Sequence, residues 1–251
     1  YKIKFIIMMK AIILAAGRGK RLGHYTKEIP KPLIDINGKS IIERQIELFK
    51  KNGITEIFVV RGYKKEKFCL EGITFIDNEN FANNNQLASL VLAQNRISGD
   101  VLILFGDLIF EQPILDQILM SNSDISIAID LKWKERYDEN RNNQFPAMAE
   151  IENDKVVRIS ENKSLIRKKL CGEFFGIIKL SSDGSKILTD VIEKTKYNKG
   201  KFHDSNSFAM GKIPDIIEEV IELGFIVQPI FVNGKWFEVD TILDLEKAKK
   251  L

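Results

Sequence analysis

The residues best suited to chemistry in this sequence form a glycine-rich segment that carries several cations. The segment directly follows an apolar run and reads Leu14-Ala15-Ala16-Gly17-Arg18-Gly19-Lys20-Arg21-Leu22-Gly23. Glycines and small residues let backbone N–H groups approach a phosphate chain closely, and three cations in four positions add positive charge. The segment is therefore predicted to be a phosphate-binding loop.

A lysine between two prolines follows this loop, ten residues after Arg21. Pro30 and Pro32 restrict the local backbone, which would hold the Lys31 ammonium in a fixed direction. An isolated Pro-Lys-Pro is more often a turn with a solvated lysine. Because this Pro-Lys-Pro follows the glycine-rich loop, we instead expect the Lys31 ammonium to make a second contact to phosphate.

Two well-known phosphate motifs do not fit this loop. A dinucleotide-binding fingerprint requires a third glycine where Leu22 stands, and an acidic residue at the end of the second strand, where the chain has Arg61. A P-loop requires Ser or Thr after Gly-Lys, and this position is occupied by Arg21. An NAD-dependent oxidoreductase and a P-loop NTPase are both disfavoured.

Two aspartates are candidates for a metal site. Asp107 comes just after the apolar run Val101–Phe105, and Asp240 ends the segment Trp-Phe-Glu-Val-Asp. A carboxylate just past a buried parallel strand is well placed for the ligand crevice of an α/β fold, although many aspartates only cap turns. Mg²⁺ binds through one or two carboxylates plus substrate phosphates. Glu238 is a weaker third candidate, because strand alternation places it on the same side as Asp240.

The elements that must position these residues alternate along the chain. Four apolar runs have the length of buried strands, namely Lys10–Ala15, Ile57–Val60, Ile73–Ile76 and Val101–Phe105. Helical spacing separates them at 41–53 and 87–93. Further strands are expected at Val156–Ile159, Phe174–Leu180 and Phe225–Phe231, and further helices at 185–195, 215–223 and 243–250. The pattern predicts an α/β, Rossmann-like, mostly parallel mixed sheet with helices on both faces.

The same pattern suggests one domain spanning residues 9–251. Residues 1–8 are interpreted as an N-terminal extension, and residues of roughly 130–180 as a small acceptor-binding excursion, since the pattern becomes polar and irregular near its start. The N-terminus has the outline of a secretory signal, but Lys10 interrupts its apolar stretch.

Composition excludes several classes of protein. The chain has 251 residues with 38 Lys+Arg against 35 Asp+Glu, and the charges are mixed rather than blocked, so a nucleic-acid arm is not expected. No apolar run reaches the roughly 18 residues of a membrane span. The two cysteines, Cys69 and Cys171, lie far apart, which favours a reducing compartment and hence the cytoplasm.

The opening motifs resemble the signature of the sugar-phosphate and choline-phosphate nucleotidyltransferases. The match runs from Leu14 to Leu22 and continues in Pro30-Lys31-Pro32-Leu33. The resemblance implies a glycosyltransferase-A-type fold in which the loop wraps a nucleoside triphosphate and Arg21 and Lys31 neutralise its phosphates. Loop residues with an implied nucleotide contact are Leu14, Ala15, Ala16, Gly17, Arg18 and Gly19. Asp107 and Asp240 resemble the family's two magnesium ligands, with Asp107 also near the nucleotide.

A later segment, Asn83-Asn84-Asn85-Gln86-Leu87-Ala88-Ser89-Leu90, resembles the branch of choline-phosphate and 2-aminoethylphosphonate cytidylyltransferases. The resemblance implies that Asn84, Asn85 and Ser89 recognise a pyrimidine edge. The alternative is a helix N-terminus capped by a single asparagine. Both interpretations remain open.

The acceptor is less well defined. Trp133, Tyr137 and Trp236 are possible aromatic walls for a quaternary ammonium group, which binds aromatic faces by cation–π attraction. Cations in the same stretch, including Arg136, would repel a bare choline and favour an acceptor with its own carboxylate or a phosphonate. Glu173 resembles a family acid that faces the acceptor and could bind an amino group, and Glu238 is a further candidate.

The expected activity is Mg²⁺-dependent transfer of CMP from CTP to phosphocholine, 2-aminoethylphosphonate or a phosphoglutamine-type acceptor, with release of pyrophosphate, for surface polysaccharide or lipid decoration. A phosphate or phosphonate acceptor is already an anion, so no protein base is needed. One alternative is a hexose-1-phosphate nucleotidyltransferase that uses UTP or dTTP. Another is a catalytically silent regulatory homologue that binds nucleotide. A homodimer is possible, and neither nucleic acid nor membrane is an expected partner.

Overall fold

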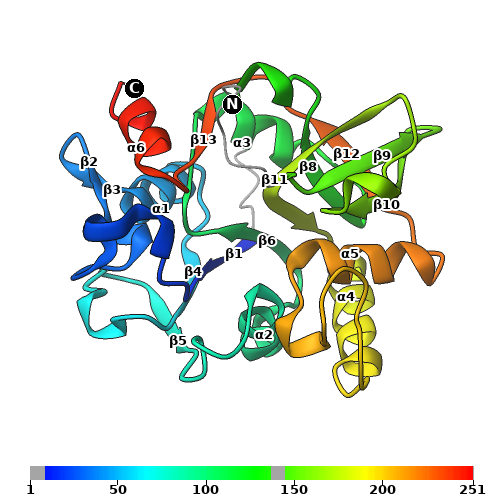
Figure 1. Ribbon diagram of the computed structural model, residues 1–251, viewed down its shortest axis with the longest axis horizontal. Coiled ribbons are helices and arrows are strands. Elements are labelled where there is room, and N and C mark those ends of the chain that lie inside the picture. The colour runs from blue at the N-terminus through cyan, green and yellow to red at the C-terminus, as the bar shows by residue number, and fades with distance from the viewer. Residues whose placement is uncertain (1–8, 137–144, 251) are drawn as a thin grey trace, which may run out of the picture.

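The computed structural model describes residues 9–136 and 145–250. Its centre is four parallel strands in the order β6 (Asp100–Phe105), β1 (Met9–Ala15), β4 (Glu56–Arg61) and β5 (Thr74–Asp77) (Figure 1). Leu14 pairs with Phe105 on one side and with Val60 on the other, so the strands end at one edge of the sheet. The expected extension at residues 1–8 and the expected aromatic wall at Tyr137 lie outside the described residues.

The sheet continues beyond β6 as a mixed region. Strand β11 (Cys171–Leu180) is antiparallel to β6 and pairs in turn with β8 and β9. The remaining strands of this nine-stranded sheet are β8 (Ile125–Asp130), β9 (Met148–Glu152), β10 (Lys155–Ser160) and β12 (Gln228–Phe231). The sheet thus combines a parallel centre with a mixed flank, as the sequence predicted.

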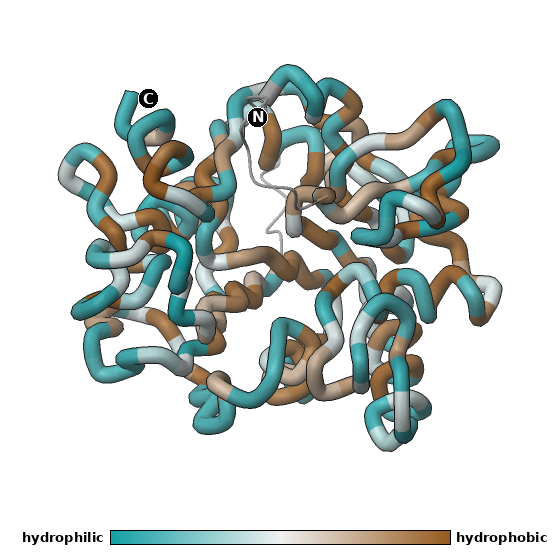
Figure 2. Tube along the Cα trace, in the orientation of Figure 1, coloured by the Kyte–Doolittle hydropathy of each residue, from teal (hydrophilic) through white to brown (hydrophobic). Residues whose placement is uncertain are grey.

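Helices cover both faces of the sheet because β1 is apolar on both. Ile12 and Leu14 pack into one core, and Ala11, Ile13 and Ala15 into the other, so the central strands are the brown segments in the middle of Figure 2. The first core contains residues of α2 (Gln86–Leu92), α4 (Ser182–Thr195) and α5 (Ile213–Glu222). The second contains residues of α1 (Ile41–Lys51) and α3 (Gln112–Leu119).

A third, smaller core holds the glycine-rich loop against the C-terminal helix. It joins Leu22, Ile34, Ile109, Val239 and Leu245, which are distant in sequence. The elements involved are the 3₁₀ helices η1 (Lys20–Thr26) and η2 (Lys31–Leu33), the strand pairs β2 (Asp35–Ile36) with β3 (Lys39–Ser40) and β7 (Leu108–Phe110) with β13 (Trp236–Glu238), and α6 (Ile242–Ala248). This core brings residues 19–31 to the segment that contains Asp240.

Local sequence fixes the start of α1. The Ser40 hydroxyl accepts a hydrogen bond from the backbone N–H of Glu43, and the Glu43 carboxylate accepts one from the backbone N–H of Ser40 at 2.8 Å. This reciprocal capping box satisfies donors that the first helical turn leaves unpaired. The Ser40 hydroxyl and backbone N–H hold the pKa of Glu43 below its usual range.

The observed elements differ from the predicted ones in several places, and helix α3 and the short strands β2, β3, β7 and β13 were among the elements not predicted. Strands β8 and β9 were not predicted, and the expected strand at 225–231 begins only at Gln228. Further short 3₁₀ helices are η3 (Lys65–Lys67), η4 (Gln94–Arg96), η5 (Trp133–Arg136), η6 (Lys163–Leu165) and η7 (Phe208–Met210). Within residues 9–136 and 145–250, no helix is both long and apolar enough to span a membrane.

Candidate active site

Lys31 lies at the centre of a cluster of charged groups near the carboxyl edge of the parallel strands. Its Nζ is 2.5 Å from Oδ2 of Asp107 and 2.5 Å from Oδ1 of Asp240. Only 7% of the residue is exposed. Burial alone would lower the pKa of the Lys31 ammonium, but the carboxylates of Asp107 and Asp240 outweigh burial and hold the pKa above its usual value. Lys31 is therefore a buried side chain that keeps its positive charge.

The two aspartates are brought together by the β7–β13 pair. Asp107 follows β6 and directly precedes β7, while Asp240 follows β13. In this antiparallel pair Glu238 lies opposite Leu108, and the Val239 N–H donates to the Asp107 carbonyl at 3.0 Å. The two carboxylates thus meet across a two-stranded ladder, although 133 positions separate them in the chain.

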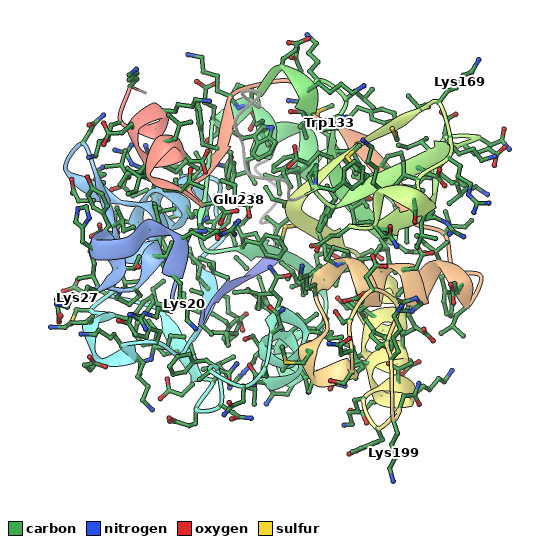
Figure 3. All side chains as sticks on the ribbon, viewed as in Figure 1. Lys20, Lys27, Trp133, Lys169, Lys199 and Glu238 are labelled. Atoms are coloured by element: carbon green, nitrogen blue, oxygen red, sulfur yellow. The ribbon has the colours of Figure 1, made fainter. Side chains whose placement is uncertain are left out.

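Asp107, Glu238 and Asp240 each offer a carboxylate oxygen within 4.8 Å of the others. Glu238 lies near the middle of the view in Figure 3. Burial of its carboxyl group, followed by the Asp240 and Asp107 carboxylates, raises the pKa of Glu238 well above its usual range, although the residue as a whole is only partly buried. The buried Oδ1 of Asp107 has no hydrogen-bond partner among the described residues. Converging carboxylates with an unsatisfied buried oxygen fit a divalent cation such as Mg²⁺.

The glycine-rich loop packs directly against the stem of Lys31. Gly19 has φ of 70°, and a Cβ at this position would lie 2.9 Å from Cβ of Lys31, so only glycine fits. The Thr26 hydroxyl donates to the Gly19 carbonyl at 3.0 Å. At Gly17, by contrast, an added Cβ would have no protein atom within 4 Å. The loop is therefore tight on its inner side and open on its outer side.

The two arginines of the loop have different surroundings. The Arg21 guanidinium is 2.9 Å from Oδ2 of Asp240, and its side chain is about half exposed (51%). The Arg18 guanidinium carbon is 5.3 Å from the centre of the Tyr63 ring. Arg21 thus belongs to the Lys31 cluster, whereas Arg18 lies over an aromatic face beside it.

Tyr63 is a loop-supporting residue that the sequence interpretation missed. Its backbone N–H donates to the Ala16 carbonyl at 3.0 Å, and its hydroxyl donates to the Lys27 carbonyl at 2.9 Å. Together with the Arg18 contact, Tyr63 touches the first half of the loop and the end of η1, which follows the loop. The available signal was its place two residues after β4, at the same sheet edge as the loop.

The asparagine-rich segment forms an internal amide network at the start of α2. Asn85 is the N-cap of α2, and its side chain accepts from the Gln86 N–H at 2.9 Å, so the capping interpretation is correct for this residue. The side-chain nitrogen of Asn78 donates to the side-chain oxygen Oδ1 of Asn84 and to the Ser89 hydroxyl, both at 2.9 Å. Ser89 is buried, whereas Asn84 is partly exposed.

The residues expected to contact the acceptor are divided among different environments. Trp236 is buried at 3% exposure, stacks on Phe175 with ring centres 4.3 Å apart, and donates from Nε1 to Asp130 at 3.0 Å. It is a core residue, so the expectation of an open aromatic wall was wrong for Trp236. Glu173 is buried on β11 opposite Asp130 of β8.

Trp133 lies at the start of η5, partly exposed, edge-on to Phe145 at 6.3 Å (Figure 3). Arg136 ends η5, and its side chain lies outside the described part of the structure. The structure therefore places Trp133 on the segment that follows β8, while Glu173 lies on the neighbouring strand.

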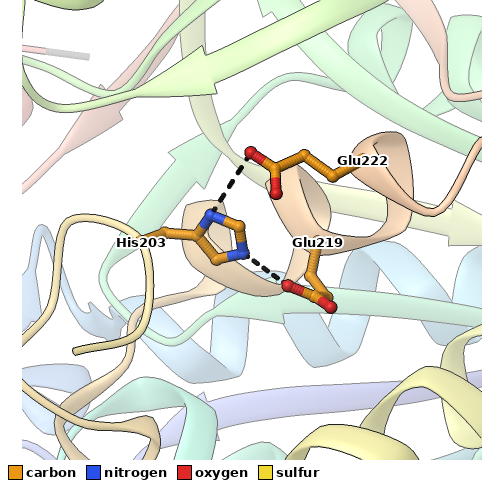
Figure 4. Close-up of side chains that lie close together, drawn as sticks. All are labelled: His203, Glu219 and Glu222. Carbon is orange, nitrogen blue, oxygen red and sulfur yellow. Dashed lines mark hydrogen bonds and ion pairs between the residues drawn. The ribbon is translucent and has the colours of Figure 1, made fainter. Parts of the chain in front are cut away.

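A second group of potential ligands lies away from the Lys31 cluster (Figure 4). The Nε2 of His203 is 2.7 Å from Oε2 of Glu219, and Nδ1 is 3.9 Å from Oε1 of Glu222. Both glutamates lie toward the end of α5. These contacts tie the loop before η7 to that helix.

Comparison with known proteins places the chain among nucleotidyltransferases. Among curated proteins, the CTP:phosphoglutamine cytidylyltransferase of Campylobacter jejuni is 24% identical over 254 residues, covering 95% of this chain and 98% of the relative. The choline-phosphate cytidylyltransferase of Streptococcus pneumoniae is 36% identical over 117 residues, covering 45% of this chain and 51% of the relative.

Two solved structures have the same fold. A Bacillus anthracis structure provisionally assigned as a glucose-1-phosphate thymidylyltransferase aligns with a TM-score of 0.74 and 21% identity, covering 96% of this chain and 94% of the other. The CTP:phosphocholine cytidylyltransferase of Streptococcus pneumoniae aligns with a TM-score of 0.68 and 23% identity, covering 97% and 99%. At these identities the likeness concerns the fold.

The fold and the loop define a nucleotidyltransferase. The family model of the MobA-like NTP transferase domain matches residues 11–155, which is more than half of the chain, and the chain belongs to this family.

Proposed function

We propose that the protein is a Mg²⁺-dependent cytidylyltransferase that transfers CMP from CTP to a small phosphorylated or phosphonate acceptor and releases pyrophosphate. The observation that carries this proposal is the placement of Lys31 between Asp107 and Asp240, directly against Gly19 of the glycine-rich loop. One site thus combines cations for phosphates with carboxylates for a metal. Such a combination suits nucleotidyl transfer, in which cations and a metal ion stabilise charge on the reacting phosphates.

The chain's own residues would act mainly by positioning and by charge. Backbone N–H groups from Leu14 to Gly19 would hold the triphosphate, while Arg18, Arg21 and Lys31 neutralise it. Asp107 and Asp240 would hold Mg²⁺, with Glu238 beside them. The ion, when bound, supplies charge stabilisation to the reacting phosphate oxygens.

The reaction balances without a protein base. An anionic oxygen of the acceptor forms a bond to the α-phosphorus in line with the leaving group, and the bond from that phosphorus to the bridging oxygen breaks. The electron pair leaves with pyrophosphate, and no proton has to be removed from the acceptor. His24 and His203 therefore need no role in the chemical step, and His203 lies in a separate group with Glu219 and Glu222.

The choice of CTP is supported by the relatives, since both curated proteins described above are cytidylyltransferases by name. In this chain Asn84 and Asn85 lie at the N-terminal end of α2 and are both partly exposed. The side chain of Asn84 is paired with that of Asn78, which also donates to the buried Ser89 hydroxyl, while the side chain of Asn85 caps the helix. We assign recognition of the base edge to this network.

For the acceptor we propose a phosphoglutamine, phosphocholine or 2-aminoethylphosphonate type of compound. Glu173 would provide a buried carboxylate for an amino or ammonium group, and Trp133 an aromatic face. Arg136 suits an acceptor that carries a further anionic group. Such products serve surface polysaccharide or lipid decoration, and we place their synthesis in the cytoplasm. Leu223, Phe225 and Ile226 are exposed near β12 and would suit a homodimer contact.

The proposal is tested by measuring pyrophosphate release with CTP, UTP, dTTP and ATP, each offered with several acceptors. CTP together with a phospho- or phosphono-acceptor should be the active pair, and Asp107→Asn should abolish turnover while the protein remains folded by circular dichroism. Turnover restricted to hexose 1-phosphates with UTP or dTTP would replace the proposal by the sugar-nucleotide alternative. CTP binding without turnover for any acceptor would favour a regulatory homologue.

A further inference from the structure

Lys31 and a metal ion would compete for the same two carboxylates. The Lys31 ammonium is 2.5 Å from one oxygen of Asp107 and 2.5 Å from one oxygen of Asp240. These residues, with Glu238, are also the group whose oxygens converge for a divalent cation. Arg21 occupies the second oxygen of Asp240 at 2.9 Å. Protein cations therefore already compensate the charge of the metal ligands.

The position of Lys31 also allows it to serve the phosphates. Cβ, Cγ and Cδ of Lys31 lie 2.9–3.2 Å from where a Cβ of Gly19 would be, so the stem runs directly beneath the glycine-rich loop. The stem is therefore held, while the ammonium at its end is carried on rotatable bonds with three donors. A rotation near the end of the side chain can exchange aspartate for a phosphate oxygen without moving η2.

We propose that Lys31 is the resident counter-ion of the metal ligands, and that a divalent metal binds well only when a triphosphate draws Lys31 away from Asp107 and Asp240. The metal and the triphosphate then bind cooperatively, each removing the obstacle to the other. This inference rests on the proposed function only in requiring that a triphosphate binds at the glycine-rich loop.

The energetic argument follows from the charges. A divalent cation placed on Asp107 and Asp240 would stand next to an ammonium that is in direct contact with both. Repulsion between charges at such separations is large even when the protein environment is strongly polarisable. A triphosphate supplies several negative charges that can pair with the Lys31 ammonium in place of the two aspartates. Reciprocity of binding requires the metal to strengthen triphosphate binding by the same factor that the triphosphate strengthens metal binding.

The test measures Mn²⁺ binding to the full chain with no nucleotide present, by calorimetry or by the electron paramagnetic resonance signal of free Mn²⁺. Lys31→Met retains the apolar stem and removes the charge. It should bind Mn²⁺ at least about tenfold more tightly than the wild type, because the competing cation is gone. Lys27→Met removes an exposed lysine of the same segment and should change the affinity less than about twofold, as expected for a solvent-screened charge.

A second variant keeps the inference testable if Lys31→Met does not fold. Arg21→Met removes only one of the two cations on Asp240, and its Mn²⁺ affinity should rise in the same direction by a smaller factor. Adding Asp107→Asn to either variant should cancel the gain. Equal or weaker Mn²⁺ binding by Lys31→Met, or by Arg21→Met, would overturn the proposal.

The coupling itself is measured with the non-hydrolysable analogue α,β-methylene-CTP. Mn²⁺ should tighten its binding to the wild type more strongly than its binding to Lys31→Met. If Mn²⁺ strengthened binding of the analogue by the same factor in both proteins, the proposed movement of Lys31 from the aspartates to the triphosphate would be contradicted. Because the Mn²⁺ titrations contain no nucleotide, their result is independent of which triphosphate the enzyme uses. A wrong assignment of CTP would appear only in the turnover measurements.

Discussion

Substitution of Gly17 tests whether this position is a glycine because a ligand needs the space, rather than because the surrounding protein does. The residue is exposed, and a Cβ built on it has no protein atom within 4 Å. Its φ also lies outside the left-handed region. Gly17→Ala therefore introduces neither a steric clash nor backbone strain in the protein alone.

The expected effect on folding is small and favourable. Replacing a glycine by alanine at a compatible position stabilises a protein by about 0.4–1 kcal/mol through the entropy of the unfolded chain. The expected effect on the triphosphate is large, because the added methyl group projects from a loop whose N–H groups are proposed to touch phosphate. Loss of one hydrogen bond to a charged group costs about 1.5–3 kcal/mol, which corresponds to about 10- to 150-fold weaker binding.

Two measurements on the same variant check this reasoning. Urea unfolding followed by circular dichroism gives the free energy of unfolding, and isothermal titration calorimetry gives the affinity for CTP with Mg²⁺. We expect a free energy of unfolding equal to or slightly above that of the wild type, together with the loss of affinity given above. A variant that is as stable as the wild type and binds CTP equally well would refute the assignment of Gly17 to the triphosphate.

Three further predictions concern the supports of the site. Gly106→Ala places a methyl group 2.9 Å from Cβ of Ala15 and should lower the free energy of unfolding by about 1–3 kcal/mol in urea titrations, as overpacking does; a stability equal to the wild type would be inconsistent with this contact. Tyr63→Phe loses the hydrogen bond to the Lys27 carbonyl at the end of η1 and should raise KM for CTP with little change in kcat, whereas an unchanged KM would argue against a positioning role. Ser40→Ala should cost about 1 kcal/mol at pH 7 in thermal unfolding. Because the pKa of Glu43 is lowered in the fold, that difference is present at neutral pH and should shrink as acid protonates Glu43; a constant difference would contradict the capping account.

The parallel centre of the fold was predictable because its strands are apolar on both faces. Lys10–Ala15 and Val101–Phe105 each form a short run with no polar residue in the middle, and both are strands in the structure within one residue of the expected bounds. Strand β8 was missed because Ser126 interrupts its apolar run, although Ser126 is fully buried and its hydroxyl lies 2.7 Å from that of Ser121. Sequence pattern does not reveal a buried polar residue that is satisfied by a partner elsewhere.

The candidate site was predictable in part. Each motif could be recognised from its own residues, but the direct contact of Lys31 with both Asp107 and Asp240 depends on the β7–β13 ladder, which joins distant segments. Trp236 was assigned wrongly because an aromatic residue beside an acidic motif has the same local pattern whether it faces a ligand or a core. Its stacking on Phe175 and its hydrogen bond to Asp130 decide the matter. These partners come from two other strands of the fold.

The central claim is tested most directly by pyrophosphate release from CTP in the presence of Mg²⁺ and one acceptor at a time, with phosphoglutamine, phosphocholine, 2-aminoethylphosphonate and glucose 1-phosphate as the set. We predict release with CTP and at least one of the first three acceptors, none with glucose 1-phosphate, and loss of all release when a chelator removes the metal. Release that requires glucose 1-phosphate and UTP or dTTP, or release that persists in the chelator, would contradict the account.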